Sequence, residues 1–244
     1  MTKTCKPADE LEWNKIPSAR SLQWMIQQQL DWLLPTVHGF SLVTFGSLAQ
    51  SFNYDRAAVA NVINLGKHSQ ADVMADVHQL PLSSDDVDGF FVPFQLEQTK
   101  EPHQMLRELV RCLRPGGELV ILTFNPYSLW GLSKLLPNRR NRLPWSLPFY
   151  SVGRLADWLT VLGLDVKLIN GLFNHRPGRQ IDQTDTLIGS KGYSRFGAVN
   201  CLVAEKQVKT LTPIKPKWSK AKVVAGTVVK PTTRIMPRNN RAEG

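Results

Sequence analysis

Residues 101–124 read EPHQMLRELVRCLRPGGELVILTF, and this stretch decides the fold class. Pro102 suits the first turn of a helix, and apolar residues then recur at helical spacing. That apolar face comprises Met105, Leu106, Leu109, Val110 and Leu113. Residues 115–117, Pro-Gly-Gly, end the helix, and the apolar run 118–124 is typical of a buried strand. The stretch therefore predicts a helix, a glycine turn and a strand in succession.

The same order recurs downstream in SVGRLADWLTVLGLDVKLI, residues 151–169. Ser151 is a helix cap, Gly163 ends the helix, and 165–169 form a strand. Five more strand-length apolar runs lie elsewhere in the chain, at 42–45, 62–65, 72–75, 87–92 and 198–204. This alternation predicts an α/β fold with a doubly wound, mostly parallel seven-stranded sheet and helices on both faces.

A lead-in helix precedes the domain that contains the predicted sheet. In residues 17–35, Leu22, Ile26 and Leu30 fall at helical spacing, and Pro35 stops the helix. We therefore expect three parts, listed here by residue number: a lead-in helix within 1–35, a domain over 36–205 with an insert at 125–150, and a tail over 206–244.

The positive charge of the chain is concentrated in that tail. The 244 residues carry a net charge of +10, yet the tail alone holds ten Lys or Arg against one acid, Glu243. The rest of the chain is nearly neutral. Four prolines and the lack of an apolar period predict a disordered tail. It is either a solubilising extension or an electrostatic arm for RNA or acidic partners, and Trp218 is its one candidate for stacking on a base.

Cysteine usage and hydropathy bear on the compartment. Cys5, Cys112 and Cys201 are odd in number and far apart, which supports neither a disulfide framework nor a thiolate metal site. No run of about 18 apolar residues occurs, and the first residues are polar where a signal peptide needs an apolar core. We expect a cytoplasmic protein with no membrane span and no bound metal.

Residues 72–132, from DVMADVHQLPL to FNPYSLWGL, resemble the S-adenosylmethionine (SAM)-dependent methyltransferases of the Rossmann-like class. The resemblance is to the type 11 group, and within it to a proteobacterial family. Two later segments, RLADWLTVLGLDV and GAVNCLVAEKQVKTLTPIKPKW, are similar to the same family. The resemblance covers about residues 17–218 and implies a Rossmann-like fold, SAM as cofactor and methyl transfer.

The resemblance implies a set of cofactor contacts beyond the ends of the strands. Asp76 would accept a hydrogen bond from the adenine amino group, and the backbone N–H of Val77 would donate to the ring. The turn after the first strand would face the methionine part of SAM, and the residues after the fourth strand would flank its methyl group. These residues are Phe45, Gly46 and Ser47 in the turn, and Pro93 and Phe94 after the fourth strand.

Two anchors that are usual in this class are missing. The turn usually reads G-x-G-x-G, but this chain has only Gly46. The second strand usually ends in an acid that grips the ribose, but Gly66-Lys67-His68 stands there instead. At about 1–1.5 kcal/mol per contact, the loss lowers affinity by roughly ten- to a hundredfold. Backbone amides of the turn remain possible donors, since they do not depend on residue type.

The substrate side of the site is predicted from Glu97, Asn125 and Trp130. Glu97 would either hold the amino group of the cofactor's methionine or cap the helix that follows. Asn125, Trp130 and the Arg- and Trp-rich insert would form the wall of a substrate pocket; the insert alone could equally be an exposed lid. Four histidines are candidate bases by type only, and no catalytic base is assigned: His68, His78, His103 and His175.

Three functions remain open on these grounds. The first is a SAM-dependent methyltransferase that acts on an unknown acceptor, small or lipid-like. The second is a non-catalytic relative that uses the fold as a scaffold for a partner. The third is an RNA-associated methyltransferase that is guided by the basic tail.

Overall fold

The computed structural model describes residues 11–136, 142–172 and 197–208. The helices and strands in chain order are α1 (Ala19–Leu33), β1 (His38–Phe45), β2 (Ala58–Gly66), β3 (Val73–Met74), β4 (Val87–Pro93), α2 (Pro102–Cys112), β5 (Leu113–Phe124), α3 (Leu129–Leu132), α4 (Val152–Val161), β6 (Leu164–Leu172) and β7 (Val199–Lys206). Short 3-10 helices include η3 (Ser47–Ser51) after β1 and η4 (Ser133–Leu135) after α3.

The seven strands form one sheet in the order β3-β2-β1-β4-β5-β7-β6. The first five strands of that order run parallel, whereas β7 runs antiparallel to both β5 and β6. The prediction of a seven-stranded, mostly parallel Rossmann-like sheet is thereby confirmed. Because these strands run parallel, the carboxyl ends of β1 to β4 share one edge of the sheet.

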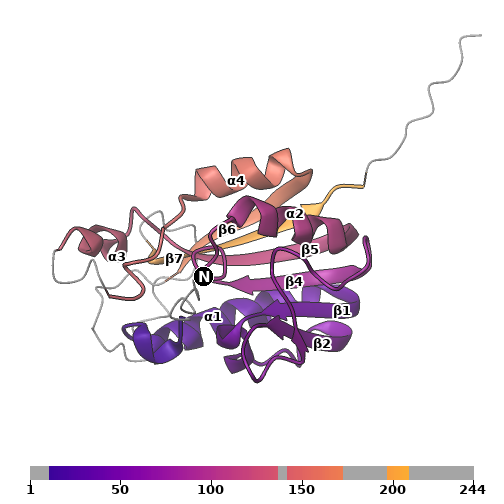
Figure 1. The fold of residues 1–244 in the computed structure, drawn as a ribbon, viewed down its shortest axis with the longest axis horizontal. Coiled ribbons are helices and arrows are strands. Elements are labelled where there is room, and N and C mark those ends of the chain that lie inside the picture. Colours follow the sequence, from indigo (N-terminus) through magenta and orange to yellow (C-terminus); the bar gives the residue numbers. More distant parts are fainter. Residues whose placement is uncertain (1–10, 137–141, 173–196, 209–244) are drawn as a thin grey trace, which may run out of the picture. The chain divides into compact units, whose positions relative to one another are not determined.

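Helices cover both faces of the sheet, as the alternation predicts (Figure 1). The stripe Leu22, Ile26 and Leu30 of α1 is almost fully buried against one face. α2 and α4 pack on the other face through their own apolar stripes. Between β1 and β2 the connection contains only η3, so the face beside β1 and β2 is covered mainly by α1.

The junction of α2 and β5 differs from the sequence prediction. β5 begins at Leu113, because this buried residue pairs with Val87 of β4; the next pair is Gly89 with Glu118. Four residues of β5, 114–117, therefore oppose one residue of β4, which is a bulge rather than a free turn. A Cβ on Gly117 would lie 2.8 Å from the carbonyl oxygen of Asp88, so the bulge needs a glycine there.

The predicted insert and tail are only partly described. The insert contains α3 and η4, while residues 137–141 lie outside the described part. Lys206, the first residue assigned to the tail, is the last residue of β7. Its Nζ donates to Asp85 Oδ1 and to the carbonyls of Val110 and Leu113 at 2.6–2.7 Å. Residues 209–244 and His175 lie outside the described residues, so the expectation of a disordered tail stays a prediction.

Candidate functional site

The turn after β1 begins at Gly46, whose φ of 78° and ψ of 171° suit only glycine. A Cβ on this residue would lie 2.7 Å from Oε1 of Gln95, which follows β4. The Gly46 amide donates to the carbonyl of Leu65 at 2.9 Å, so it continues the ladder with β2. This amide is therefore engaged within the sheet, and the role of Gly46 toward a cofactor stays a prediction that depends on the missing side chain.

Asn64 joins the ends of β1 and β2, a role that the sequence reasoning missed. Its buried amide nitrogen donates to Thr44 Oγ1 at 2.9 Å and to the Gly46 carbonyl at 3.2 Å. Its backbone N–H donates to Asp72 Oδ2 at 2.7 Å. The only available signal was a polar residue inside the apolar run 62–65. Asn64 thus fixes the path of the chain into the turn at Gly46.

Asp76 follows β3 and is the centre of a polar network at the same edge. Its Oδ2 accepts a hydrogen bond from Lys67 Nζ at 2.7 Å, and its Oδ1 accepts from the His78 amide at 3.0 Å and contacts His78 Nδ1 at 2.8 Å. The hydrogen bond from Lys67, followed by that from the His78 amide, holds the pKa of the Asp76 carboxyl well below its usual range. The other ring nitrogen of His78 contacts Thr99 Oγ1 at 2.6 Å. Residues from three loops are therefore connected around one carboxylate that is 45% exposed.

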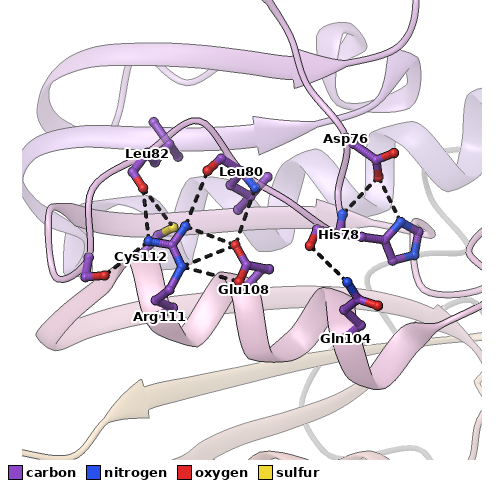
Figure 2. Close-up of polar contacts among 9 residues, drawn as sticks. Asp76, His78, Leu80, Leu82, Gln104, Glu108, Arg111 and Cys112 are labelled. Carbon is purple, nitrogen blue, oxygen red and sulfur yellow. Dashed lines mark hydrogen bonds and ion pairs between the residues drawn. The ribbon is translucent and has the colours of Figure 1, made fainter.

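Helix α2 holds the loop that carries Asp76, as Figure 2 shows. Arg111 donates to the carbonyls of Leu80 and Leu82 and to Ser84 Oγ at 3.1–3.3 Å. The same guanidinium is paired with Glu108 at 2.9 Å, and Glu108 in turn accepts the Leu80 amide at 3.4 Å. We call this set the α2 clamp. It positions residues 76–84 from outside the site, and so gives Arg111 a structural role.

The α2 clamp predicts that Arg111→Met will loosen the loop without unfolding the sheet. The substitution keeps a long apolar stem on α2 but removes the guanidinium donor from the carbonyl of Leu80 and leaves that of Leu82 only the weak thiol donor of Cys112. We expect faster amide hydrogen exchange across residues 76–84 and unchanged exchange in β5, measured by mass spectrometry. Arg107→Met, one turn earlier on the exposed side of α2, is the control; equal exchange in both variants would contradict the role of the clamp.

Glu97 lies after β4 and is only 2% exposed. Its Oε1 accepts the Phe124 amide at 2.8 Å, whereas its Oε2 has no hydrogen-bond partner among the described residues. Burial raises the pKa of this carboxyl to about 8. Burial also raises the pKa of Tyr150, with a further contribution from the nearby Glu97. The carboxyl thus joins the ends of β4 and β5, and its raised pKa favours the protonated form at neutral pH.

Most of the remaining predicted site residues have buried side chains, whereas Ser47 and Val77 are partly buried, and Val77 packs against the α2 face. Phe45 packs on Phe90 with ring centroids 5.8 Å apart, and Phe94 stacks on Phe124 at 4.4 Å. Trp130 is fully buried. Asn125 donates through Nδ2 to the Gly197 carbonyl at 2.8 Å and accepts from the amide of Tyr127, so it shapes the chain after β5. Asn125 and Trp130 are thus both buried, so their assignment to a substrate pocket stays a prediction, while Ser47 and Pro93 lie at the strand ends.

Within 11–136, 142–172 and 197–208, no three His, Cys, Asp or Glu side chains are grouped to hold a metal ion. Within the same ranges no helix combines the length and apolar character that crossing a membrane requires.

The sequence of the chain is similar to known methyltransferase domains and to an uncharacterized protein. Residues 43–121 match the family model of a methyltransferase domain. The chain is 29% identical over 214 residues to the uncharacterized protein YafS of Escherichia coli. The aligned segment covers 86% of this chain and 88% of that protein. A shorter segment of 53 residues, 22% of each chain, is 42% identical to a demethylmenaquinone methyltransferase of Clavibacter sepedonicus.

Solved structures share the fold at low sequence identity. One is the protein bound to the Trm112 methyltransferase activator in a complex from Haloferax volcanii; it is 16% identical, with a TM-score of 0.58 over 78% of this chain and 92% of that one. Another is a SAM-dependent methyltransferase of Thermotoga maritima, described as a possible histamine N-methyltransferase, which is 17% identical with a TM-score of 0.56 over 77% and 95%. The fold is therefore the Rossmann-like fold of the SAM-dependent methyltransferases.

Proposed function

We propose that this chain, whose residues 43–121 match the methyltransferase domain family and whose sheet has the SAM-dependent methyltransferase fold, transfers a methyl group from SAM to an acceptor. The observation that carries the proposal is the convergence of the Cβ-free turn at Gly46, the Asp76 carboxylate and the His68 ring at one edge of the sheet. This is the edge at which ligands of open α/β sheets bind.

The Asp76 carboxylate has room for the adenine amino group. Its Oδ1 already contacts two groups of His78, but Oδ2 has only Lys67 and keeps one acceptor position. Because Asp76 stays ionised far below neutral pH, it is an acceptor under all physiological conditions. We assign Asp76 to the adenine and Val77, the next residue of the turn, to the ring nitrogen beside it.

The ribose side of the site carries His68 where an acid is usual. Both ring nitrogens of His68 are shielded from water and lack a hydrogen-bond partner among the described residues. The ring lies over Gly66, since Nδ1 would be 2.4 Å from a Cβ at that residue. A neutral imidazole offers one donor and one acceptor, which two vicinal hydroxyls match. The residues present thus fit an adenosine without the missing carboxylate.

SAM, when bound, supplies a methyl group on a positively charged sulfur that is a good leaving group. The protein then has to align the acceptor with the methyl and exclude water. The turn at Gly46 and the segment after β4 would hold the methionine part, and the acceptor would approach from the side of α3. A base is needed only where the nucleophile must lose a proton, and no residue is assigned to that step.

The direct test is binding of SAM and S-adenosylhomocysteine to the purified chain. At a free ligand concentration of about 100 times the dissociation constant, linkage stabilises the protein by about 2.7 kcal/mol, or roughly 5–10 °C in melting temperature. Asp76→Ala is expected to remove most of this shift, whereas Asp157→Ala, on the exposed side of α4, is expected to keep it. A chain that shows no shift with either ligand is a scaffold rather than a methyltransferase.

A further inference from the structure

The segment of α3 and η4 turns an apolar surface toward the solvent. Leu129, Leu132, Leu135 and Leu136 are all exposed, with Leu135 at 82% and Leu132 at 56%. We call these four residues the leucine face. Leu129 and Leu132 lie three residues apart in α3, Leu135 ends η4, and Leu136 follows it in extended backbone. A surface helix normally presents polar residues outward, so an apolar outer side is unusual.

The opposite side of the same segment is fixed to the body of the protein. Trp130 is fully buried and stacks over Phe124, and its carbonyl accepts hydrogen bonds from Trp145 Nε1 at 2.9 Å and from Ser133 Oγ at 2.7 Å. Ser128 caps the helix by accepting the Gly131 amide at 3.0 Å. These contacts fix the orientation of α3. The leucine face therefore stays exposed, because it cannot turn inward without breaking these contacts of Trp130 and Ser128.

In the sequence, the segment that carries the leucine face has charges of one sign only. Between residues 119 and 156 the sequence has five Lys or Arg and no Asp or Glu. Lys134 lies within η4 itself, with its Nζ at 2.7 Å from the Leu147 carbonyl and over the ring of Phe149. Exposed Arg142 follows the segment. Exposed leucines beside cations and without acids are the composition that binds the headgroup region of an anionic bilayer.

We propose that the leucine face docks the protein on an anionic lipid bilayer. The exposed residues are leucines, which are under-represented in the hot spots of protein–protein interfaces, so a bilayer fits this surface better than a protein partner. α3 lies at the end of the sheet where β4 and β5 finish (Figure 1), so docking brings the carboxyl edge to the lipid. The proposed docking on lipid does not depend on whether the protein transfers a methyl group.

The test is co-sedimentation of the full chain with vesicles of phosphatidylcholine and with the same vesicles containing phosphatidylglycerol. We expect binding to the anionic vesicles that falls at least about tenfold in Leu135→Glu, because one protruding leucine is exchanged for a charge. Val161→Glu, at an apolar position of α4 that is 86% exposed, is the matched control and is expected to bind like the parent chain.

Three outcomes would overturn the proposal. The first is that the parent chain does not co-sediment with anionic vesicles. The second is a Leu135→Glu variant that still binds them as the parent does, which would assign binding to the basic tail alone. The third is that the leucine face is already covered, by a second copy of the chain or by the chain itself. A second copy would show as a dimer that Leu135→Glu converts to a monomer in light scattering. Cover by the chain itself would show as a melting temperature of Leu135→Glu well below that of Val161→Glu. Loss of vesicle binding with both of these properties unchanged supports the proposal.

Discussion

Replacing Glu97 with glutamine is expected to remove a large part of the pH dependence of folding stability. The Glu97 carboxyl is buried, accepts the Phe124 amide through Oε1 and has an unpartnered Oε2. Its pKa is about 8, and burial is the main cause. An unfolded glutamate titrates at about 4.3, so the folded state holds this proton over a window in which the unfolded state has released it.

The direction of the effect follows from that difference in bound protons. Because the folded state binds more protons between about pH 4.3 and about pH 8, stability falls as the pH rises through this window. The slope approaches about 1.4 kcal/mol per pH unit and sums to about 5 kcal/mol across the window. A glutamine side chain carries no charge at any pH, so this contribution to the slope would vanish in Glu97→Gln.

The measurement is urea unfolding of both proteins at a series of pH values, with the difference in free energy of unfolding plotted against pH. We expect Glu97→Gln to gain stability relative to the parent as the pH rises from about 5 to about 8. Glu101→Gln, at an exposed position four residues later, is the control and is expected to run parallel to the parent. A parallel curve for Glu97→Gln as well would mean that Glu97 is already ionised at neutral pH.

The parts of the fold that follow local patterns could be predicted from the sequence. The stripes of α1 and α2 and the strands of the sheet depend on the spacing of apolar residues, which the sequence displays directly. The bulge at residues 114–117 could not be predicted, since it depends on the pairing of Leu113 with Val87, far away in the sequence. The antiparallel direction of β7 likewise depends on a tertiary arrangement.

The candidate site was predictable in position but not in its contacts. The ends of the strands point to Gly46 and Asp76, because parallel strands finish at one edge. The sequence reasoning did not connect Lys67 to Asp76, although the two side chains meet at 2.7 Å. It left Glu97 between two roles, and the structure adds a third, acceptance of the Phe124 amide. Such pairings depend on how loops pack, and a single sequence carries no signal for them.

Gly46→Ala is expected to weaken SAM binding at least about tenfold while leaving the sheet folded. The φ of 78° with ψ of 171° costs an alanine about 1–3 kcal/mol of backbone strain. Its Cβ would also come within 2.7 Å of Gln95 Oε1, which can move because it ends a flexible side chain. The stability loss is therefore tolerable, but the methyl group would fill the place where the methionine part of SAM must approach the turn.

Gly163→Ala separates this steric effect from strain. Gly163 also has a positive φ, of 86°, but no heavy atom lies within 4 Å of the Cβ it would gain, and it follows α4 rather than a strand of the site. Both variants are expected to melt below the parent. Only Gly46→Ala is expected to weaken SAM binding, by at least about tenfold in titration calorimetry, since the lost approach removes contacts worth about 1.4 kcal/mol or more. If Gly46→Ala instead binds SAM as tightly as Gly163→Ala, the cofactor does not touch the turn after β1, and the glycine is needed only for the path of the backbone.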